Sequence, residues 1–291
     1  MRPRRSVLSM PADRSRFHEK ANAIPADEVM FDLEDSVAPA NKNAARQVMV
    51  ASLQNLSIPG KTVAVRVNPR GTPWFEGDVK AALSCSRVDT LVLPKVGSAD
   101  EILEVEALLT RVGRRLGLEP QIESAAGLEH AGEIAAASPL VEVLHLGPFD
   151  LAASLGTPTE GTEIPEELYM HALIRVLIAA RASGCQAVDG PFVGLQDSEG
   201  LKRSARRAAH LGCDGKWAIH PDQVAFINTA FTPPEADIER AKAILFEYAR
   251  ALAAGRGAVS LDGEMLDEAI RRWAEGTLAK AAGRDSDSAI R

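Results

Sequence analysis

The chain alternates short apolar runs with longer amphipathic stretches, and the alternation occurs eight times. We interpret the apolar runs as β-strands and the stretches between them as helices. The expected strands cover residues 5–10, 28–33, 62–67, 90–93, 120–122, 141–146, 186–188 and 216–219. Strands that are apolar at nearly every position are typical of a parallel sheet covered on both faces. Eight such units without an additional edge strand predict an α/β fold that closes into a (β/α)8 TIM barrel.

An open, doubly wound sheet is the alternative fold. It would be favoured by a glycine-rich turn after the first strand, but residues 11–13 are Pro-Ala-Asp. A length of 291 residues suits one α/β barrel, and 46% hydrophobic with 25% charged residues suits a globular protein with a full core. The barrel is therefore the more economical prediction.

Composition argues against several classes of protein. The net charge is −7 and the basic clusters are short, so nucleic-acid binding has little support. Cys85, Cys185 and Cys213 are far apart and lack a nearby histidine pattern, so we expect neither a disulfide framework nor a zinc site. The N-terminus lacks the apolar core of a signal peptide, and no run of about 18 apolar residues occurs. We therefore expect a cytoplasmic protein that does not contact membranes.

Two acidic residues follow two successive predicted strands. Glu123 comes directly after the first of these strands, and Asp150 lies just past the Gly147-Pro148 end of the second. If the strands are parallel neighbours, both carboxylates lie at the same edge of the sheet. Residues 119–156 contain no Lys or Arg to neutralise them, so they suit a hard divalent cation, and Mg²⁺ better than zinc. Two solvated loop acids are an equally open interpretation of the spacing alone.

Other strand ends also carry polar side chains, namely Glu34, Asp35, Arg66, Lys95, Asp189 and His220. Arg66 closes an otherwise apolar strand, where an unpaired guanidinium would be costly, so we expect it to face an anion at the barrel mouth. A fixed arginine beside a divalent cation would orient a small oxo acid and stabilise an enolate or alkoxide. Asp189 and His220 are equally explained as turn or cap residues.

The motifs at these strand ends, taken together, resemble a known family. The motifs are DLEDSV (32–37), VRVN (65–68), LPKV (93–96), IESAAG (122–127), a G-x-x-D at 147–150, DGKWAIHP (214–221) and LDGEMLD (261–267). In this order and spacing the chain resembles the citrate lyase β-subunit and malyl-CoA lyase family of the HpcH/HpaI-type aldolase superfamily. The resemblance covers the chain from Arg5 to about Ala281.

The resemblance implies an enzyme, a carbon–carbon lyase that uses Mg²⁺ or Mn²⁺. Such an enzyme would reversibly cleave a 3-hydroxyacyl-CoA, such as malyl-CoA, β-methylmalyl-CoA or citramalyl-CoA, into a 2-oxo acid and acetyl-CoA or propionyl-CoA. Three alternatives stay open. They are a citrate lyase β subunit acting on citryl-ACP, a thioesterase that hydrolyses malyl-CoA, and a homologue without catalytic activity.

The resemblance also implies roles for individual residues of the site. Glu123 and Asp150 would bind the metal, and Glu123 would lie beside the substrate. Arg66 would contact the oxo acid and stabilise the negative charge that develops during catalysis. Glu34 and Asp35 would form hydrogen bonds with metal-bound waters.

We expect the C-terminal part of the chain to form an extension of the barrel. The barrel domain is placed at residues 1–232 and the helical extension at residues 233–291. A first amphipathic helix is expected to run to about Ala253. A final helix is expected to carry Leu266 and Trp273 on one face, together with Ile270.

Two further parts of the site are implied by the resemblance alone. The CoA phosphates would lie near Arg5 and Lys20, and another part of CoA near the backbone at Pro221. Asp262 of the DGEM motif would act as the acid/base at the acetyl-CoA methyl carbon of a neighbouring subunit, in a homotrimer or hexamer. The alternative is that the extension packs on its own barrel and that Asp262 caps the final helix.

Overall fold

The computed structural model describes residues 1–157, 164–253, 259–261 and 264–288. The chain forms two compact units, Met1–Thr229 and Ala230–Arg291. Within the described residues, no helix combines the length and the apolar character that crossing a membrane requires.

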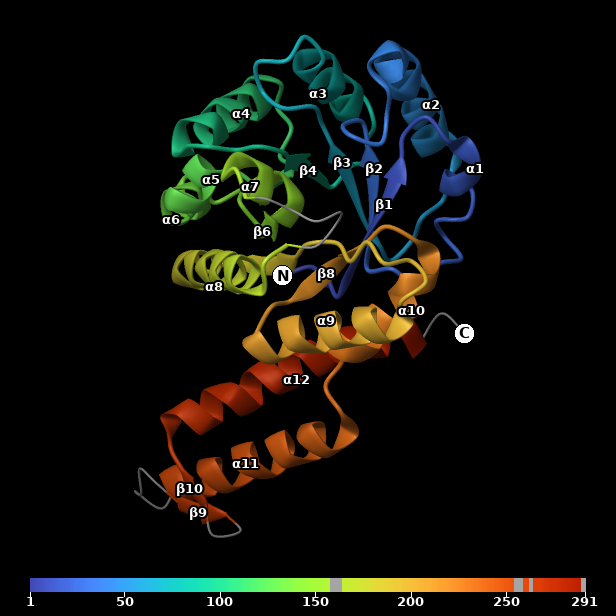
Figure 1. Cartoon of the computed structure of the whole chain (residues 1–291). Coiled ribbons are helices and arrows are strands. Elements are labelled where there is room, and N and C mark those ends of the chain that lie inside the picture. The colour runs from blue at the N-terminus through green and yellow to red at the C-terminus, as the bar shows by residue number, and fades with distance from the viewer. Residues whose placement is uncertain (158–163, 254–258, 262–263, 289–291) are drawn as a thin grey trace. The chain divides into compact units, whose positions relative to one another are not determined.

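The first unit is built on a closed barrel of eight parallel strands (Figure 1). The strands are β1 (Ser6–Pro11), β2 (Glu28–Asp32), β3 (Thr62–Arg66), β4 (Thr90–Leu93), β5 (Gly117–Ile122), β6 (Val143–Leu146), β7 (Gln186–Asp189) and β8 (Gly215–Ala218). β1 pairs with both β2 and β8, with Ser6 opposite Lys216, and this pairing closes the sheet. The predicted barrel is confirmed. β5 starts earlier than predicted. Gly117 and Glu119 interrupt its apolar pattern, so the prediction left them out, but both residues pair with β4.

Helices cover the outside of the barrel (Figure 1). They are α1 (Ser15–His18), α2 (Lys42–Asn55), α3 (Phe75–Leu83), α4 (Ala99–Arg111), α5 (Ala125–Glu129), α6 (Ala131–Ala136), α7 (Pro148–Ser154), α8 (Glu166–Ser183), α9 (Ser198–Leu211) and α10 (Pro221–Phe231), with a 3-10 turn, η1 (Pro39–Asn41). The single helix expected between β5 and β6 is in fact two short helices. α7 follows the Gly147-Pro148 end of β6, where no helix was predicted, and Pro148 suits the first helical position because no N–H is needed there.

Strand side chains fill the interior of the barrel. An apolar layer consists of Val7, Met30, Ala64, Val92, Val143, Val188 and Trp217. Side chains two positions apart on a strand face the same way, so Arg66 and His145 share the inner face of their strands with Ala64 and Val143. The interior therefore holds buried polar groups next to an apolar layer, and these groups lead to the candidate site.

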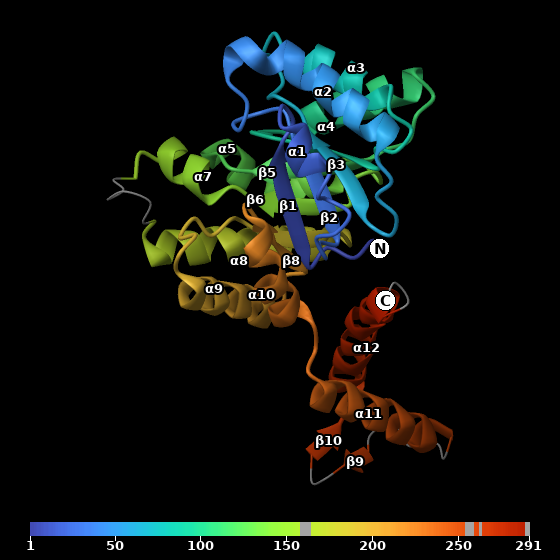
Figure 2. The same ribbon diagram turned by 90° about the vertical axis from the view of Figure 1, so that its right-hand side faces the viewer.

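The second unit contains two helices and a two-stranded sheet (Figure 2). α11 (Glu235–Ala253) is followed by the antiparallel strands β9 (Val259–Leu261) and β10 (Glu264–Leu266). α12 (Glu268–Ser288) then packs against α11. The apolar core of this unit consists of Ala241, Ile244, Tyr248, Leu266 and Ala274, with Leu245, Ile270 and Leu278 packed against it.

The prediction for the final helix needs a correction. Leu266 ends a strand and is buried in the core, whereas Trp273 is 45% exposed and does not share its buried face. α12 starts only after Asp267, whose side chain accepts hydrogen bonds from the amides of Ala269 and Ile270 at 2.9 and 3.0 Å. Asp262, to which the resemblance assigns acid/base chemistry, lies outside the described residues.

Candidate active site

Charged side chains gather where the barrel strands end. Glu34 and Asp35 follow β2, Arg66 ends β3, Lys95 follows β4, Glu123 follows β5, and Asp150 lies in α7 after β6. Neighbouring parallel strands end at the same edge, so the fold brings these side chains to one end of the barrel. Reacting sites of (β/α)8 enzymes form at this carboxyl end.

Glu123 is buried, with only 2% of its surface exposed. Its Oε1 accepts a hydrogen bond from the backbone amide of Lys95 at 2.8 Å, and its Oε2 accepts one from the side-chain amide of Gln121. A Cβ atom at Gly147 would lie 2.3 Å from Oε2 of Glu123. The glycine of the G-x-x-D motif therefore leaves the space that the Glu123 carboxylate occupies.

The surroundings of Glu123 favour its neutral form. Burial and the negative charges of Glu34 and Asp150 raise the pKa of Glu123 to about 8, against the opposing effect of Arg66 and Lys95. At neutral pH the carboxyl group is therefore mostly protonated. A cation that binds Glu123 must displace this proton.

Asp150 lies in the first turn of α7, and its side chain is 41% exposed. The ammonium group of Lys95 lies 3.6 Å from Oδ1 of Asp150 and 2.7 Å from Oε1 of Glu34. It also lies 4.0 Å from Oδ1 of the exposed Asp35. Lys95 thus joins Asp150 to Glu34 through its side chain and holds Glu123 through its backbone amide.

Lys95 is the cation that the local sequence argument missed. Residues 119–156 contain no Lys or Arg, but the fold brings in Lys95 from 28 positions before Glu123. Its backbone has a φ of 55°, in the left-handed region that residues other than glycine seldom adopt. Lys95 was identified among the polar strand-end residues, but nothing local connects it with Glu123 or Asp150.

The donors at this end of the barrel fit a magnesium ion with few protein ligands. Among the described residues, no three acidic side chains here bring ligand atoms within 4.8 Å of one another. Mg²⁺ usually keeps several waters and takes one or two carboxylates from a protein. Glu123 and Asp150 supply two carboxylates, and the buried side-chain oxygen of Gln121 has no hydrogen-bond partner. The set therefore suits Mg²⁺ with water as its other ligands.

A tighter group of possible ligands lies elsewhere in the barrel interior. Ligand atoms of Glu28, Glu119 and His145 lie within 4.8 Å of one another, and all three residues are buried. The guanidinium of Arg4 already binds this group, with Nε 2.9 Å from Glu28 and Nη2 2.8 Å from Glu119. Because Arg4 supplies the positive charge, we interpret the group as a buried ion cluster and not as a metal site.

Arg66 has the anionic partners that its position in an apolar strand predicts. Its Nε and Nη2 donate to the two oxygens of Asp32 at 2.8 and 2.7 Å, and its Nη1 lies 3.0 Å from Oε2 of Glu34. Burial opposes the charge of Arg66, but Asp32 and Glu34 together raise its pKa above the usual value. Five N–H groups are present on a guanidinium, and the hydrogen bonds to Asp32 use one on Nε and one on Nη2. The contact with Glu34 is an ion pair and not a hydrogen bond, so one N–H on Nη2 and both on Nη1 remain for a ligand.

Asp32 was not predicted as a site residue, because it lies inside the expected strand. Burial alone would raise the pKa of Asp32, but the bidentate contact with Arg66 lowers it. Glu34 is also buried, and burial raises its pKa despite the nearby Arg66 and Lys95. The arginine is thus held by one carboxylate that is firmly ionised and a second that is less so.

Asp32, Arg66 and Asp150 line a cavity of about 450 Å³. Its polar lining consists of Ser9, Asp32, Asp35, Ser36, Arg66, Gln121 and Asp150, and its apolar lining includes Pro11, Pro148, Phe149, Pro191, Trp217 and Ile219. A small number of charged groups on a largely apolar wall is the usual composition of a small-molecule site. The cavity suits an oxo acid whose carbon chain contacts the apolar wall.

The structure does not bring every predicted substrate residue to this cavity. Arg5 precedes β1 at the amino end of the barrel, where its guanidinium binds Asp27 at 2.7 and 2.9 Å. A contact of Arg5 with CoA phosphates near the cavity therefore has no support from the geometry. Lys20 is exposed after α1, and Pro221 begins α10 two residues beyond Ile219 of the cavity wall.

Asp189, one of the strand-end residues, serves the structure of the barrel wall. It is completely buried, and its Oδ2 accepts a hydrogen bond from the ammonium of Lys216 at 2.6 Å. The hydroxyl of Tyr169 donates to its Oδ1. His220 lies instead at the surface, where its Nδ1 is 3.5 Å from Asp222.

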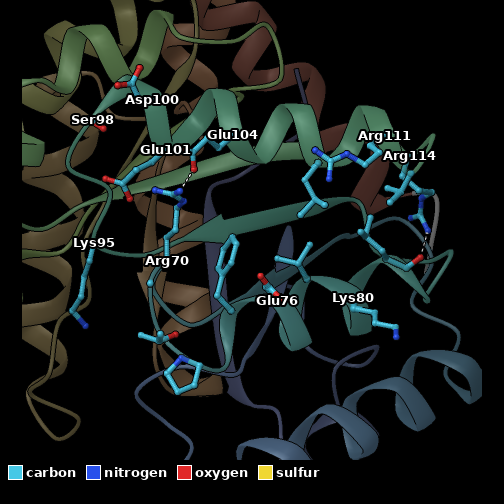
Figure 3. Close-up of a pocket in the computed structure, with 18 residues that line it drawn as sticks. Arg70, Glu76, Lys80, Lys95, Ser98, Asp100, Glu101, Glu104, Arg111 and Arg114 are labelled. Atoms are coloured by element: carbon cyan, nitrogen blue, oxygen red, sulfur yellow. Dashed lines mark hydrogen bonds and ion pairs between the residues drawn. The ribbon is translucent and has the colours of Figure 1, made fainter.

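A larger groove of about 1580 Å³ lies along α3 and α4 (Figure 3). Lys95 lies at one end of it, and Arg111 and Arg114 lie at the other. Arg70 within the groove pairs with Glu104, and Arg114 donates to backbone oxygens, including that of Leu83 at 2.7 Å. These two arginines are therefore already occupied, whereas Arg66 in the smaller cavity keeps N–H groups for a ligand.

Comparison with known proteins assigns the chain to a group of lyases. A family model described as HpcH/HpaI aldolase/citrate lyase matches residues 5–221. An L-malyl-CoA/β-methylmalyl-CoA lyase from Rhodobacter capsulatus is 40% identical, over 93% of this chain and 92% of the relative. A (3S)-malyl-CoA thioesterase from Cereibacter sphaeroides is 35% identical, over 96% of this chain and 95% of the relative.

A solved structure gives the same assignment. The protein CitE from Mycobacterium tuberculosis, in complex with magnesium, acetoacetate and coenzyme A, superposes with a TM-score of 0.78. It is 32% identical, and the match covers 95% of this chain and 97% of CitE. The resemblance inferred from the motifs is confirmed, and the relatives named lyases agree with the predicted class of enzyme.

Proposed function

Because this chain belongs to the HpcH/HpaI aldolase/citrate lyase family, we propose that it is a magnesium-dependent carbon–carbon lyase acting on a 3-hydroxyacyl-CoA. The substrate would be malyl-CoA, β-methylmalyl-CoA or a close analogue, and the products a 2-oxo acid and acetyl-CoA or propionyl-CoA. One observation carries the proposal: Asp150 and the fixed Arg66 line the same cavity, and the side-chain amide of Gln121 in its wall donates to the buried carboxylate of Glu123. The identity of 40% with a lyase of this specificity supports the choice of substrates.

Glu123 and Asp150 are the residues that would hold the metal. Mg²⁺ bound there would act as a Lewis acid toward the oxygens of the oxo acid. Glu34 and Asp35 share the ammonium of Lys95 with Asp150, and they would form hydrogen bonds with metal-bound water, as the resemblance implies. The CitE structure with magnesium, acetoacetate and coenzyme A supports this use of the site.

Arg66 would bind the oxygens of the oxo acid with the N–H groups that Asp32 and Glu34 leave unused. Those two carboxylates fix the plane of the guanidinium before substrate arrives, so little ordering is needed on binding. When the bond between C2 and C3 of the thioester breaks, the C3 hydroxyl gives its proton to solvent water, and its oxygen becomes the carbonyl oxygen of the 2-oxo acid. The bonding electrons pass to C2 as a thioester enolate, and C2 then takes up a proton. We assign this proton transfer to Asp262 of a neighbouring subunit in a homotrimer or hexamer.

The direct test is an assay of purified CoA esters for 2-oxo acid release. We expect glyoxylate from malyl-CoA or β-methylmalyl-CoA, loss of activity with EDTA, and recovery on addition of Mg²⁺. Citramalyl-CoA would give pyruvate, and a methyl-sized difference in a pocket corresponds to about 10–200-fold discrimination. Absence of 2-oxo acid from every ester of the panel would overturn the proposal.

A thioesterase is the second candidate, because a (3S)-malyl-CoA thioesterase is 35% identical over nearly the whole chain. Hydrolysis would release malate and free CoA without glyoxylate, so a thiol assay and a 2-oxo acid assay on the same sample separate the two reactions. An acyl-carrier substrate, as for a citrate lyase β subunit, would appear as activity only with citryl-ACP. A cytoplasmic location and the absence of nucleic-acid partners stay predictions from composition.

A further inference from the structure

Three buried side chains form a hydrogen-bonded column through the barrel interior. Nε1 of Trp217 lies 2.6 Å from Nδ1 of His145, and Nε2 of His145 lies 2.7 Å from Oε2 of Glu119. His145 and Glu119 are fully buried and do not line the cavity at Arg66, whereas Trp217 does line it. The column therefore connects the cavity wall to residues that no substrate can touch.

The chemistry of the partners fixes the state of His145. An indole nitrogen can only donate, so Nδ1 of His145 must be the acceptor. In a neutral imidazole the other nitrogen then carries the proton and donates to Glu119. Burial also lowers the pKa of His145, which agrees with a neutral ring. Each polar atom along the column thus has a partner of the correct kind.

Glu119 is anchored from the amino end of the barrel. Its Oε1 accepts a hydrogen bond from Nη2 of Arg4 at 2.8 Å, and Arg4 itself is bound by Glu28 at 2.9 Å and by Gln186 at 2.6 Å. Arg4 and Glu119 have fully buried side chains. A charged acceptor held by a buried arginine makes the His145 orientation rigid.

The other end of the column supports the site arginine. The ring of Trp217 lies under the guanidinium of Arg66, with 5.3 Å from Cζ to the ring centroid. Asp32 and Glu34 hold the edges of the same guanidinium. An aromatic face attracts a cation that lies over it, so the attraction depends on the ring keeping its face toward the guanidinium. Rotation of the indole would therefore disturb the arginine.

We propose that His145 and Glu119 are positioning residues of the reacting site. They fix the indole plane of Trp217, and through it the guanidinium of Arg66, which binds the carboxylate of the 2-oxo acid. The role of Arg66 in this inference rests on the proposed function, whereas the pinning of Trp217 does not. Failure of the two ideas can therefore be separated by experiment.

The test compares His145→Leu with His145→Gln. Leucine removes both hydrogen bonds, whereas the amide of glutamine can accept from the indole with its oxygen and donate to Glu119 with its nitrogen. Both changes are made with Trp74 and Trp273 replaced by Phe, so that Trp217 is the sole tryptophan. Its fluorescence then reports the indole hydrogen bond, and calorimetry gives the Kd of glyoxylate in the presence of Mg²⁺.

We expect His145→Leu to shift the Trp217 emission to shorter wavelength and to weaken glyoxylate binding about tenfold, the factor that corresponds to one buried hydrogen bond. His145→Gln should stay close to the parent in both measurements. In a protein that also carries Trp217→Phe, His145→Leu should weaken glyoxylate binding little further, because the indole N–H through which His145 acts is absent. Mn²⁺ affinity should change little, since Glu123 and Asp150 do not belong to the column.

Ile102→Ala on α4 is the matched control, since it removes buried apolar volume away from the column. It should lower the melting temperature without changing glyoxylate affinity. Unchanged emission in folded His145→Leu would overturn the pinning of Trp217. An emission shift with unchanged glyoxylate affinity, or a loss of affinity that persists after Trp217→Phe, would overturn the positioning role. Absence of glyoxylate binding and of lyase activity in the parent protein would overturn the proposed function instead.

Discussion

Lys95 contacts Glu123 with its backbone and not with its charge: the amide lies 2.8 Å from Oε1, while the ammonium lies 2.7 Å from Glu34. The same ammonium is 3.6 Å from Asp150, the other expected metal ligand. Lys95 thus orients the Glu123 carboxylate through its amide, and its ammonium competes with a metal cation for Asp150. Substitutions that retain the backbone can separate the two effects.

Lys95→Met should bind divalent cations more tightly than the parent. The change keeps the amide that holds Glu123 but removes a positive charge beside Asp150 and Glu34, and a like charge a few ångströms away weakens cation binding by on the order of 1 kcal/mol, or about fivefold. Titration with Mn²⁺, followed by electron paramagnetic resonance, measures the Kd. Lys80→Met, at an exposed position on α3, is the control. A weaker Kd in Lys95→Met would show that the ammonium supports the metal site.

Glu123 should make the metal-free protein less stable as the pH rises. Its pKa of about 8 exceeds the ordinary carboxyl value of 4.5, so the folded state binds the proton more tightly than the unfolded state. This contribution is complete below about pH 4.5 and is lost as the pH rises through 8. In EDTA, the free energy of unfolding measured with urea should fall by about 5 kcal/mol at most across that window.

Glu123→Gln serves to isolate this effect, because it cannot titrate and should lack the same pH-dependent loss. Glu129→Gln, at an exposed position on α5, should behave as the parent does. Added Mg²⁺ should restore the stability of the parent at high pH and leave Glu123→Gln unchanged. Identical pH profiles for the parent and Glu123→Gln would contradict the raised pKa.

Gly147→Ala should damage the metal site although position 147 carries no functional group. The new Cβ would lie 2.3 Å from Oε2 and 2.5 Å from Cβ of Glu123, so the carboxylate must move. We expect a loss of about 1–3 kcal/mol of stability together with weaker Mn²⁺ binding. Gly132→Ala is the matched control, because nothing lies within 4 Å of its added Cβ. Intact Mn²⁺ affinity in Gly147→Ala would mean that Glu123 does not bind the metal in its present position.

The barrel could be predicted from sequence because its signal is local and repeated. Apolar runs of strand length, each followed by an amphipathic stretch, leave few alternatives to a closed parallel sheet. The predicted element bounds are wrong where the residue types at a position do not match the secondary structure that the position adopts. β5 contains Gly117 and Glu119 yet pairs with β4, and α7 begins at Pro148, which was expected only to end a strand.

The site could be predicted only in part, because strand ends are readable but contacts across the barrel are not. Glu123, Asp150 and Arg66 were identified from their positions after or within apolar strands. Asp32 was not assigned to the site, and Lys95 was named as a strand-end residue without a role, because their partners lie 34 and 61 positions away in the chain. Long-range pairing of this kind depends on strand order and register, which no local pattern encodes.

A mixture of two inactive variants should recover activity if Asp262 acts across a subunit interface. Glu123→Gln lacks a metal ligand in its own barrel, and Asp262→Asn lacks the acid/base. In a mixed oligomer, the barrel of an Asp262→Asn subunit can receive the intact Asp262 of a Glu123→Gln neighbour, which completes one site. Random mixing in equal amounts would give about a quarter of the parent activity, since half of the barrels and half of the donated tails are intact.

The measurement is 2-oxo acid release after the variants are unfolded together, refolded and compared with each variant refolded alone. Activity that stays at the level of the separate variants, in oligomers shown to contain both chains, would favour the alternative in which the extension serves its own barrel.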